Sequence, residues 1–318
     1  MILMENQTFY TDFYIVVFST TGGKQILLFF LFGILYLVCV LWNMIIVIMI
    51  YFDHHLHIPM YFLLCNLSFI DALYSSVTLP KLMEILLSGN NRVSFTACFA
   101  QLFFFSSMIS TEIFLLTAMA FDRYVAICNP LHYTMLMKKR NCIILIASSW
   151  AAGYSNSLFG TIFSSYLSFC GSNTINQLFC DIKVLMKISC GETERFQALI
   201  FVEAITLGLC PFLVIIMSYG KILSNILKIN TTKKRNKTFS TCSSHLTVLF
   251  LFYGTVICMY MRPPSANSEN LDHILSVFYL VVTPTLNPFI YSMRNKEIKN
   301  ASVKMLTCKR TLKCIHTS

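Results

Sequence analysis

Seven stretches of the chain are apolar and long enough to cross a lipid bilayer. A helix that spans the hydrocarbon core needs about 20 residues, and none of the seven stretches contains more than one Asp, Glu, Lys or Arg. Backbone exposed to lipid must satisfy its own hydrogen bonds, which favours helices. The pattern therefore predicts an all-α membrane protein that folds as a bundle of seven transmembrane helices. The predicted spans cover residues 26–51, 58–80, 93–121, 142–163, 196–220, 239–261 and 273–293.

Composition and motifs exclude several classes of protein. Only 12% of the residues are charged, whereas soluble domains carry roughly 25%. The net charge of +10 is spread over the loops between the apolar runs, so nucleic acid is not an expected partner. The sequence contains no nucleophile elbow, metal-binding helix motif or phosphate loop. We therefore expect no enzyme activity.

Lys and Arg set the expected orientation. With the N-terminus outside, 17 of the 24 basic residues lie in cytoplasmic segments and seven lie outside, as the positive-inside rule requires. We predict an extracellular segment over residues 1–25, a seven-helix membrane domain over 26–293 and a cytoplasmic tail over 294–318 that begins with a short amphipathic helix. A glycosylation sequence at Asn6 falls on the predicted outer side.

Four cysteines also fall on the predicted outer side, where disulfides can form. Cys98 begins the third span, and Cys170, Cys180 and Cys190 lie in the loop between the fourth and fifth spans. Four cysteines allow three pairings, and their spacing does not choose among them.

Residues 119–133 read MAFDRYVAICNPLHY and place three chemically distinct side chains, Asp122, Arg123 and Tyr124, where the third span meets water. Ionised groups at this depth tend to be paired, interfacial or functional. Arg123 can pair with Asp122 in one state and be released to a partner in another, which is the behaviour of a two-state switch. The alternative is a simple interfacial anchor.

Four further polar residues lie at mid-membrane depth on four different spans, and we expect them to face the bundle interior and to satisfy one another. Two acids close together would share a proton or bind a cation. The alternative is a structural hydrogen-bond cluster. The four residues are Asn43, Asp71, Glu112 and Asn287.

Five motifs occur in order along the chain. LHIPMYFL opens the second span, MAFDRYVAICNPLHY closes the third, SY ends the fifth, KTFSTCSSHL opens the sixth and PTLNPFIYSMRN closes the seventh. Together they resemble the olfactory (odorant) receptors, a branch of the rhodopsin-like (class A) G-protein-coupled receptors, over nearly the whole chain. The departures are small: Trp42 precedes Asn43 where the family usually has glycine, and the sixth span lacks the tryptophan of most rhodopsin-like receptors.

The resemblance implies a multi-pass plasma-membrane receptor that couples to a stimulatory, olfactory-type heterotrimeric G protein and raises cyclic AMP. It also implies two disulfides, Cys98–Cys180 and Cys170–Cys190. Arg123 becomes the activation switch, and Tyr219 and Tyr291 would meet it when the sixth span moves outward. The resemblance also implies that the polar core is a network that rearranges on activation. A sodium ion is the most that this network would hold, and the resemblance implies no other cofactor or metal site. Expected partners are an odorant, the G protein and membrane lipid.

The ligand pocket is expected in the outer half of the third, fifth and sixth spans. A mostly apolar cavity with a few polar groups suits small, weakly polar ligands. Glu203 is the sharpest candidate, because a lone acid in the middle of a span needs a reason. Its alternatives are to receive an amine or a hydroxyl of the ligand, or to pair within the bundle. For each of the other residues the alternative is ordinary helix packing. The candidates are Phe105, Ser106, Ile109, Ser110, Glu203, Thr206, Tyr253, Val256, Ile257 and Tyr260.

Two other functions fit the same composition. One is a seven-helix receptor for a metabolite that is not an odorant. The other is an ion-coupled transporter or channel in which the buried acids relay ions. A transporter would show flux or current without a G protein, which separates it from both kinds of receptor.

Overall fold

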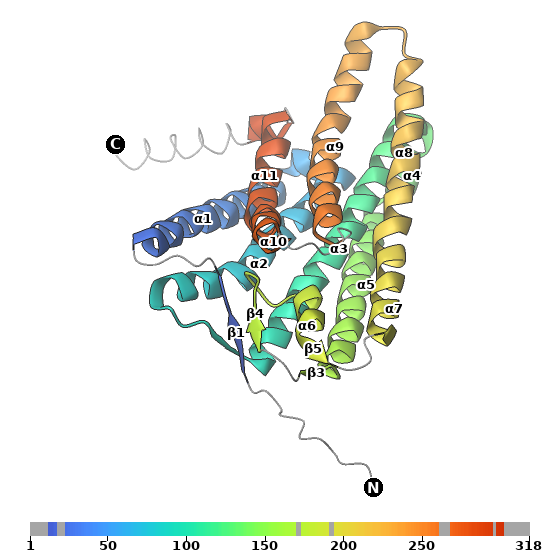
Figure 1. The fold of residues 1–318 in the computed structure, drawn as a ribbon. Coiled ribbons are helices and arrows are strands. Elements are labelled where there is room, and N and C mark those ends of the chain that lie inside the picture. The colour runs from blue at the N-terminus through green and yellow to red at the C-terminus, as the bar shows by residue number, and fades with distance from the viewer. Residues whose placement is uncertain are drawn as a thin grey trace, which may run out of the picture.

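The computed structural model of the chain describes residues 12–17, 23–169, 173–190, 194–260, 268–294 and 297–301 (Figure 1). Its long helices are α1 (Gly23–Phe52), α2 (Pro59–Ser88), α3 (Phe95–Cys128), α5 (Lys139–Ser165), α7 (Glu194–Glu203), α8 (Cys210–Leu227), α9 (Thr232–Tyr260), α10 (Ser268–Val277) and α11 (Thr283–Arg294). Shorter helices are η1 (His54–Leu56), η2 (Pro130–His132), α4 (Tyr133–Leu136) and α6 (Ile182–Ile188), and two π-helical segments are η3 (Ala204–Leu209) and η4 (Phe278–Val282). The strands are β1 (Asp12–Ile15), β2 (Arg92–Ser94), β3 (Ser168–Phe169), β4 (Thr174–Ile175) and β5 (Ser189–Cys190).

The described residues contain seven helices that are long and apolar enough to cross a membrane, which confirms the predicted seven-helix bundle. Segments α7, η3 and α8 form the fifth of them, and α10, η4 and α11 form the seventh. Several helices are longer than the apolar runs that predicted them; α9 begins at Thr232, whereas the apolar run begins at residue 239. The apolar run marks only the part of a helix that lies in hydrocarbon, and the backbone hydrogen bonds continue into the interface.

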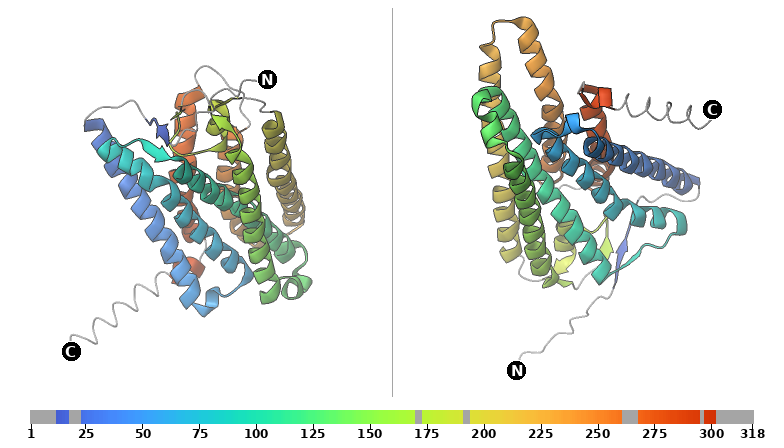
Figure 2. Two further views of the ribbon diagram at one scale, coloured as in Figure 1. Left: turned by 90° about the horizontal axis from the view of Figure 1, so that it is seen from below. Right: turned by 180° about the vertical axis from the view of Figure 1, so that it is seen from behind.

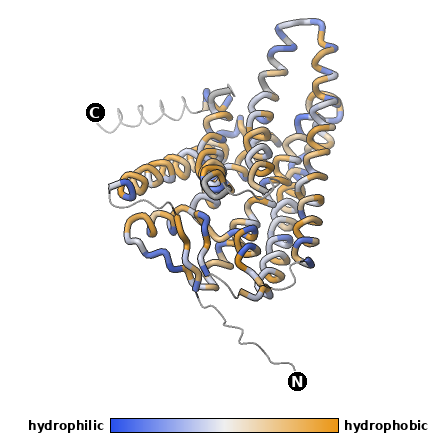
Figure 3. The backbone as a smooth tube through the Cα atoms, viewed as in Figure 1, coloured by the Kyte–Doolittle hydropathy of each residue, from blue (hydrophilic) through white to orange (hydrophobic). Residues whose placement is uncertain are grey.

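Helix α3 lies at the centre of the bundle and packs against α2, α5, α8 and α9 (Figure 2). Large apolar side chains are exposed along α1, α5 and α8, and hydrophobic residues dominate the helices in Figure 3, with hydrophilic residues concentrated near their ends. Soluble proteins rarely expose apolar surfaces of this extent to water. In a bilayer they contact lipid.

Five short strands lie at one end of the bundle, together with α6 (Figure 1). We call this end the strand end and the opposite end, where α3 finishes, the switch end. Strand β1 is central in a three-stranded sheet, antiparallel to β2 and parallel to β4, while β3 pairs with β5. The side chains of Phe13 and Ile15 are fully buried beneath this sheet. The apolar runs gave no signal for these strands, because each is four residues or shorter.

Both π-helical segments lie just before a proline. Segment η3 ends at Leu209, ahead of Pro211, and η4 ends at Val282, ahead of Pro284. Proline has no backbone N–H, so the regular hydrogen-bond pattern is interrupted at these positions. Single π turns inside α-helices are frequent at functional sites. These two prolines thus coincide with a local widening of the helix.

Candidate functional site

At the switch end, Asp122 and Arg123 form an ion pair. The Nε and Nη2 atoms of Arg123 lie 2.9 and 2.5 Å from Oδ2 of Asp122. The Asp122 side chain is fully buried and that of Arg123 is only 14% exposed. Removal of one partner from a buried ion pair costs free energy, because the other partner is left as an unpaired buried charge. Arg123 is therefore held in the bundle by its neighbour on α3.

Tyr133 of α4 supplies a third donor to the same carboxylate. Its hydroxyl donates a 2.9 Å hydrogen bond to Oδ1 of Asp122. Partial burial, and then the nearby charge of Asp122, raise the pKa of Tyr133, so its hydroxyl stays protonated and remains a donor. Sequence reasoning assigned no role to Tyr133, although it is the last residue of the quoted motif.

Tyr124 does not join the ion pair. Its ring packs with Ile222 and Ile226 of α8 and with Cys242 of α9, and the ammonium group of Lys221 lies 5.5 Å from the ring centre. The third residue of the predicted switch thus connects α3 to two neighbouring helices by packing and a cation–π contact.

Tyr219 and His245 join α8 to α9 beside the ion pair. The Tyr219 hydroxyl lies 2.6 Å from Nδ1 of His245, and His245 is fully buried. The charge of Arg123 is close enough to act on both side chains. His245 was quoted only as a motif letter in the sequence; a lone histidine in an apolar run was the signal that could have marked it. Tyr291 is also buried, and its hydroxyl has no hydrogen-bond partner among the described residues.

The polar core brings two of its four predicted members into direct contact. Asn287 donates a 3.0 Å hydrogen bond to Oδ2 of Asp71. Glu112 is 5% exposed and lies near enough to Asp71 for their charges to interact. Asn43 instead donates to the backbone carbonyls of Cys39 and Pro284, each at 3.0 Å.

Three buried oxygens of this core have no partner in the described part of the chain: Oδ1 of Asn43, Oε1 of Glu112 and Oδ1 of Asn287. Buried polar atoms are normally satisfied by protein or ordered water. Carboxylate and amide oxygens are also the ligands that hard cations take. The residues present therefore fit either ordered water or a small cation.

The predicted ligand residues do not all face the same region of the bundle interior. Phe105 is buried in an aromatic cluster, with its ring centre 4.3 Å from Phe179 and 5.1 Å from Tyr74. Ser106, Ile109 and Val256 are half-buried, and Ser110 and Tyr253 are buried. Thr206 is exposed and donates to the carbonyl of Val202 on its own helix. Ile257 is 40% exposed, so the structure brings neither Thr206 nor Ile257 to the interior candidates.

Glu203, the last residue of α7, is half-buried against α5. Its carboxylate interacts with the side chain of Asn156, whose amide lies 3.5 Å from Oγ of Ser110 on α3. Sequence reasoning placed Glu203 in the pocket but did not connect it to the fourth span. Asn6, Cys170 and the side chain of Tyr260 fall outside the described residues, so the predictions made for them stay predictions.

Comparison with known proteins decides the family. A sequence model of the olfactory receptor family matches residues 32–309. The chain is 45% identical to human olfactory receptor 6B1 over 305 residues, covering 96% of this chain and 97% of the relative. It is 45% identical to mouse olfactory receptor 1E16, covering 96% and 98%, and 43% identical to rat olfactory receptor 1496, covering 95% and 98%. The chain belongs to the olfactory receptor family.

As an olfactory receptor, the protein is a G-protein-coupled receptor that crosses the plasma membrane several times, and it is not an enzyme. Its strand end is fastened by the predicted disulfide between Cys98 and Cys180, which the structure confirms. Next to it, the side chain of Gln101 accepts from the backbone N–H of Cys180. The loop that carries Cys180 is thus attached to α3 at two adjacent points.

The same loop is also attached to the sixth and seventh spans of the receptor. Lys183 donates to the carbonyl of Met259 at 2.9 Å and lies 3.6 Å from Asp272. Ser276 donates to the side chain of Gln177 at 3.1 Å. These contacts, with strand β1 beside β4, form a cap over the strand end.

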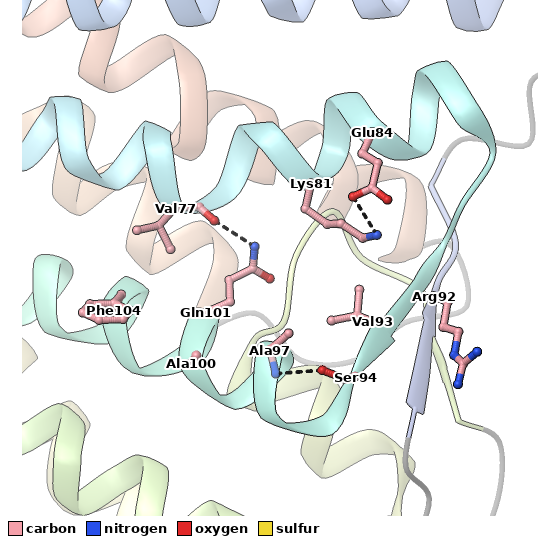
Figure 4. Close-up of a pocket in the computed structure, with 10 residues that line it drawn as sticks. All are labelled: Val77, Lys81, Glu84, Arg92, Val93, Ser94, Ala97, Ala100, Gln101 and Phe104. Carbon is pink, nitrogen blue, oxygen red and sulfur yellow. Dashed lines mark hydrogen bonds and ion pairs between the residues drawn. The ribbon is translucent and has the colours of Figure 1, made fainter.

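A groove of about 520 Å³ lies between α2 and α3 near this cap (Figure 4). None of the predicted ligand residues lines it. Its polar groups already have partners, since Lys81 binds Glu84 and the amide of Gln101 donates to the carbonyl of Val77. We therefore interpret this groove as a region of polar contacts between two helices and not as the odorant site.

Proposed function

We propose that this olfactory receptor binds a small, mostly apolar odorant among α3, α7 and α9 on the strand-end side of the polar core, and that it activates a stimulatory, olfactory-type G protein that raises cyclic AMP. The strand end faces outward and the switch end faces the cytoplasm. This orientation is supported by the excess of Lys and Arg in the segments at the switch end. The family membership supports the receptor class, and the ligand and the G protein are the proposed details.

The observation that carries the proposal is the retention of Arg123 by Asp122 and the nearby Tyr219–His245 contact between α8 and α9. The segment 221–246 contains no Asp or Glu, so no acid at the base of the sixth span holds Arg123 at rest. In the proposed mechanism a bound odorant favours a state in which α9 moves outward. Arg123 then leaves Asp122 and becomes available to the G protein. A ligand can shift such an equilibrium only by binding one state better than the other.

The polar core would couple the two ends. In this proposal Asp71, Glu112, Asn287 and Asn43 form a network that rearranges on activation, with water or sodium at the oxygens that lack protein partners. The proximity of Tyr291 to both Asp71 and Tyr219 supports a role for it in linking the core to the switch. The alternative, a purely structural cluster, predicts that its variants fail to fold rather than change their signalling.

The basic segments of the switch end, including Lys138, Lys139 and Arg140, are proposed to contact anionic lipid and the G protein. Lys138 lies in the short connection between α4 and α5, and Lys139 and Arg140 begin α5. The charged face therefore adjoins the Asp122–Tyr133 contact and the switch.

The test is a cyclic AMP assay in cells that display the receptor, with a panel of small volatile molecules and Arg123→Ala as the paired control. We expect a ligand-dependent rise that Arg123→Ala abolishes at equal surface level. A rise of wild-type size in the variant would remove Arg123 from the mechanism. A response only to non-volatile metabolites would favour the metabolite receptor, and current or flux without G protein would favour the transporter.

A further inference from the structure

Three helices contribute polar groups to one point near the strand end. Glu203 ends α7, Asn156 and Gly160 lie one turn apart on α5, and Ser110 lies on α3. The side chain of Asn156 interacts with the Glu203 carboxylate and lies 3.5 Å from the Ser110 hydroxyl. An acid, an amide and a hydroxyl are thus connected across the bundle.

The chain leaves space for this carboxylate. A Cβ atom built on Gly160 would lie 3.3 Å from Oε1 of Glu203, so the absence of a side chain at Gly160 lets the carboxylate approach α5 closely. The π-helical segment η3 begins at the next residue, Ala204. Such segments alter which face of a helix the following residues occupy, and they are frequent at functional sites.

An aromatic pair separates this point from the strand end. Phe163 lies one turn beyond Gly160 on α5, and its ring centre is 4.5 Å from that of Phe196 near the start of α7. Glu203 is seven residues into the fifth span, or about 10 Å along the helix axis. Glu203 therefore lies about two helical turns into the span from the strand end.

A carboxylate in this position requires compensation. It can accept up to about four hydrogen bonds, and among the described residues the side chain of Asn156 is the one near enough to act on it. None of the ion pairs formed within the described ranges includes Glu203. Acids at membrane depth are normally paired or part of a ligand or ion path. An ammonium group would supply both a positive charge and hydrogen-bond donors to this carboxylate.

We infer that Glu203, oriented by Asn156, is the counter-ion of the ligand, and that the odorants of this receptor include small apolar molecules with a protonated amine. The ammonium group donates to the carboxylate, and Ser110, beside Asn156, is placed to accept a further hydrogen bond. A charge-assisted hydrogen bond of this kind is about twice as strong as a neutral one. A neutral alcohol of the same shape would gain less from Glu203. This inference rests on the receptor function proposed above.

The experiment compares matched ligands on matched variants. Hexylamine and cyclohexylamine are paired with hexanol and cyclohexanol, and cyclic AMP is measured in cells that display equal amounts of each receptor. Glu203→Gln keeps the shape and removes the charge. Glu194→Gln is the control, because it makes the same change at an exposed acid on the same helix.

We expect the amines to be the stronger agonists of the wild-type receptor. In Glu203→Gln the amine concentration for half-maximal response should rise about tenfold or more, while the response to alcohols and the behaviour of Glu194→Gln should remain close to wild type. If Glu203→Gln does not reach the surface, Gly160→Ala should show a smaller loss in the same direction, because its methyl group crowds Oε1.

Two outcomes would overturn the inference and leave the receptor function in place: an Arg123-dependent response to alcohols alone, or an amine response that Glu203→Gln and Gly160→Ala do not weaken. A displayed receptor whose basal signal equals that of Arg123→Ala and that responds to no compound would contradict both. The readouts therefore separate a failure of the counter-ion assignment from a failure of the proposed function.

Discussion

The side-chain amide of Asn43 on α1 donates a 3.0 Å hydrogen bond to the backbone carbonyl of Pro284 on α11. This carbonyl is the one that residue 288 would bind in a regular helix, but residue 288 is a proline and has no N–H. Asn43 therefore supplies, from another helix, the donor that Pro288 removes. The break in α11 is compensated by a side chain more than 240 residues away in the sequence.

Asn43→Ala should destabilise the receptor, because it leaves a buried carbonyl without a donor. The expected cost is about 1–3 kcal/mol, seen as a lower unfolding temperature in detergent and as reduced surface display. Asn141→Ala is the matched control, since Asn141 also donates to a backbone carbonyl but at an exposed position. Equal effects of the two variants would show that the hydrogen bond to the Pro284 carbonyl contributes no more to stability than an exposed one.

Gly153→Ala should disrupt the packing of α3 against α5. A Cβ atom on Gly153 would lie 2.9 Å from the carbonyl oxygen of Ser107, and it would also collide with the side chain of Thr111. Overpacking of this kind costs about 1–3 kcal/mol and sometimes more, and the obstruction here includes backbone that cannot turn away. We expect a clear loss of surface display, whereas Gly220→Ala, with open space around its Cβ position, should be displayed normally.

Phe13→Ala should loosen the cap without unfolding the bundle. Phe13 is fully buried beneath the sheet, and its ring packs edge-on to Phe169 at 5.3 Å. Loss of a buried phenylalanine costs about 3–5 kcal/mol of local stability, so residues 12–17 should become accessible to protease in intact cells. The neighbouring Tyr14 is 39% exposed on the opposite face of β1, and Tyr14→Ala should leave the cleavage rate unchanged.

The hydrophobic pattern was sufficient to predict the seven helices and their order, because length and apolarity alone decide what can cross a bilayer. The resemblance supplied the Cys98–Cys180 bridge, which the residue spacing had left open. The cap was not predictable in the same way. Strand β1 is four residues long, and its pairing with β2 and β4 depends on where the loops arrive in space.

The candidate site was predictable only in part. Arg123 and Asp122 stand out because charges are rare in apolar runs. Tyr133, which bonds to Asp122, and the neighbouring Tyr219–His245 pair are recognised only when α4, α8 and α9 are placed. Thr206 was also predicted to line the pocket, but it lies within the π-helical segment η3, which changes the helix periodicity, and its side chain is exposed.

Tyr133→Phe should weaken the retention of Arg123 and raise basal signalling in a manner that does not depend on pH. The pKa of Tyr133 is raised by burial and by Asp122, so the folded receptor favours the protonated hydroxyl. Its bond to Asp122 is fully formed below the ordinary tyrosine pKa of about 10 and is lost only as the pH rises through the higher folded value. Nucleotide exchange on membranes should therefore differ between variant and wild type by a constant factor from about pH 6 to about pH 9. A step in the wild-type signal within this range that the variant lacks would contradict the assignment.

The Tyr219–His245 contact should act as one unit in signalling. The 2.6 Å hydrogen bond joins α8 to α9 at the level of Arg123. Because the bond needs both side chains, removal of either one removes the whole contact. Tyr219→Phe and His245→Phe should each change ligand-stimulated cyclic AMP, and the double variant should change it no further, because interacting residues give non-additive effects. Tyr219→Phe combined with Glu194→Gln provides the additive reference, since Glu194 lies at the far end of the fifth span. Additive losses in the Tyr219–His245 pair would mean that the two side chains contribute to the switch through separate contacts.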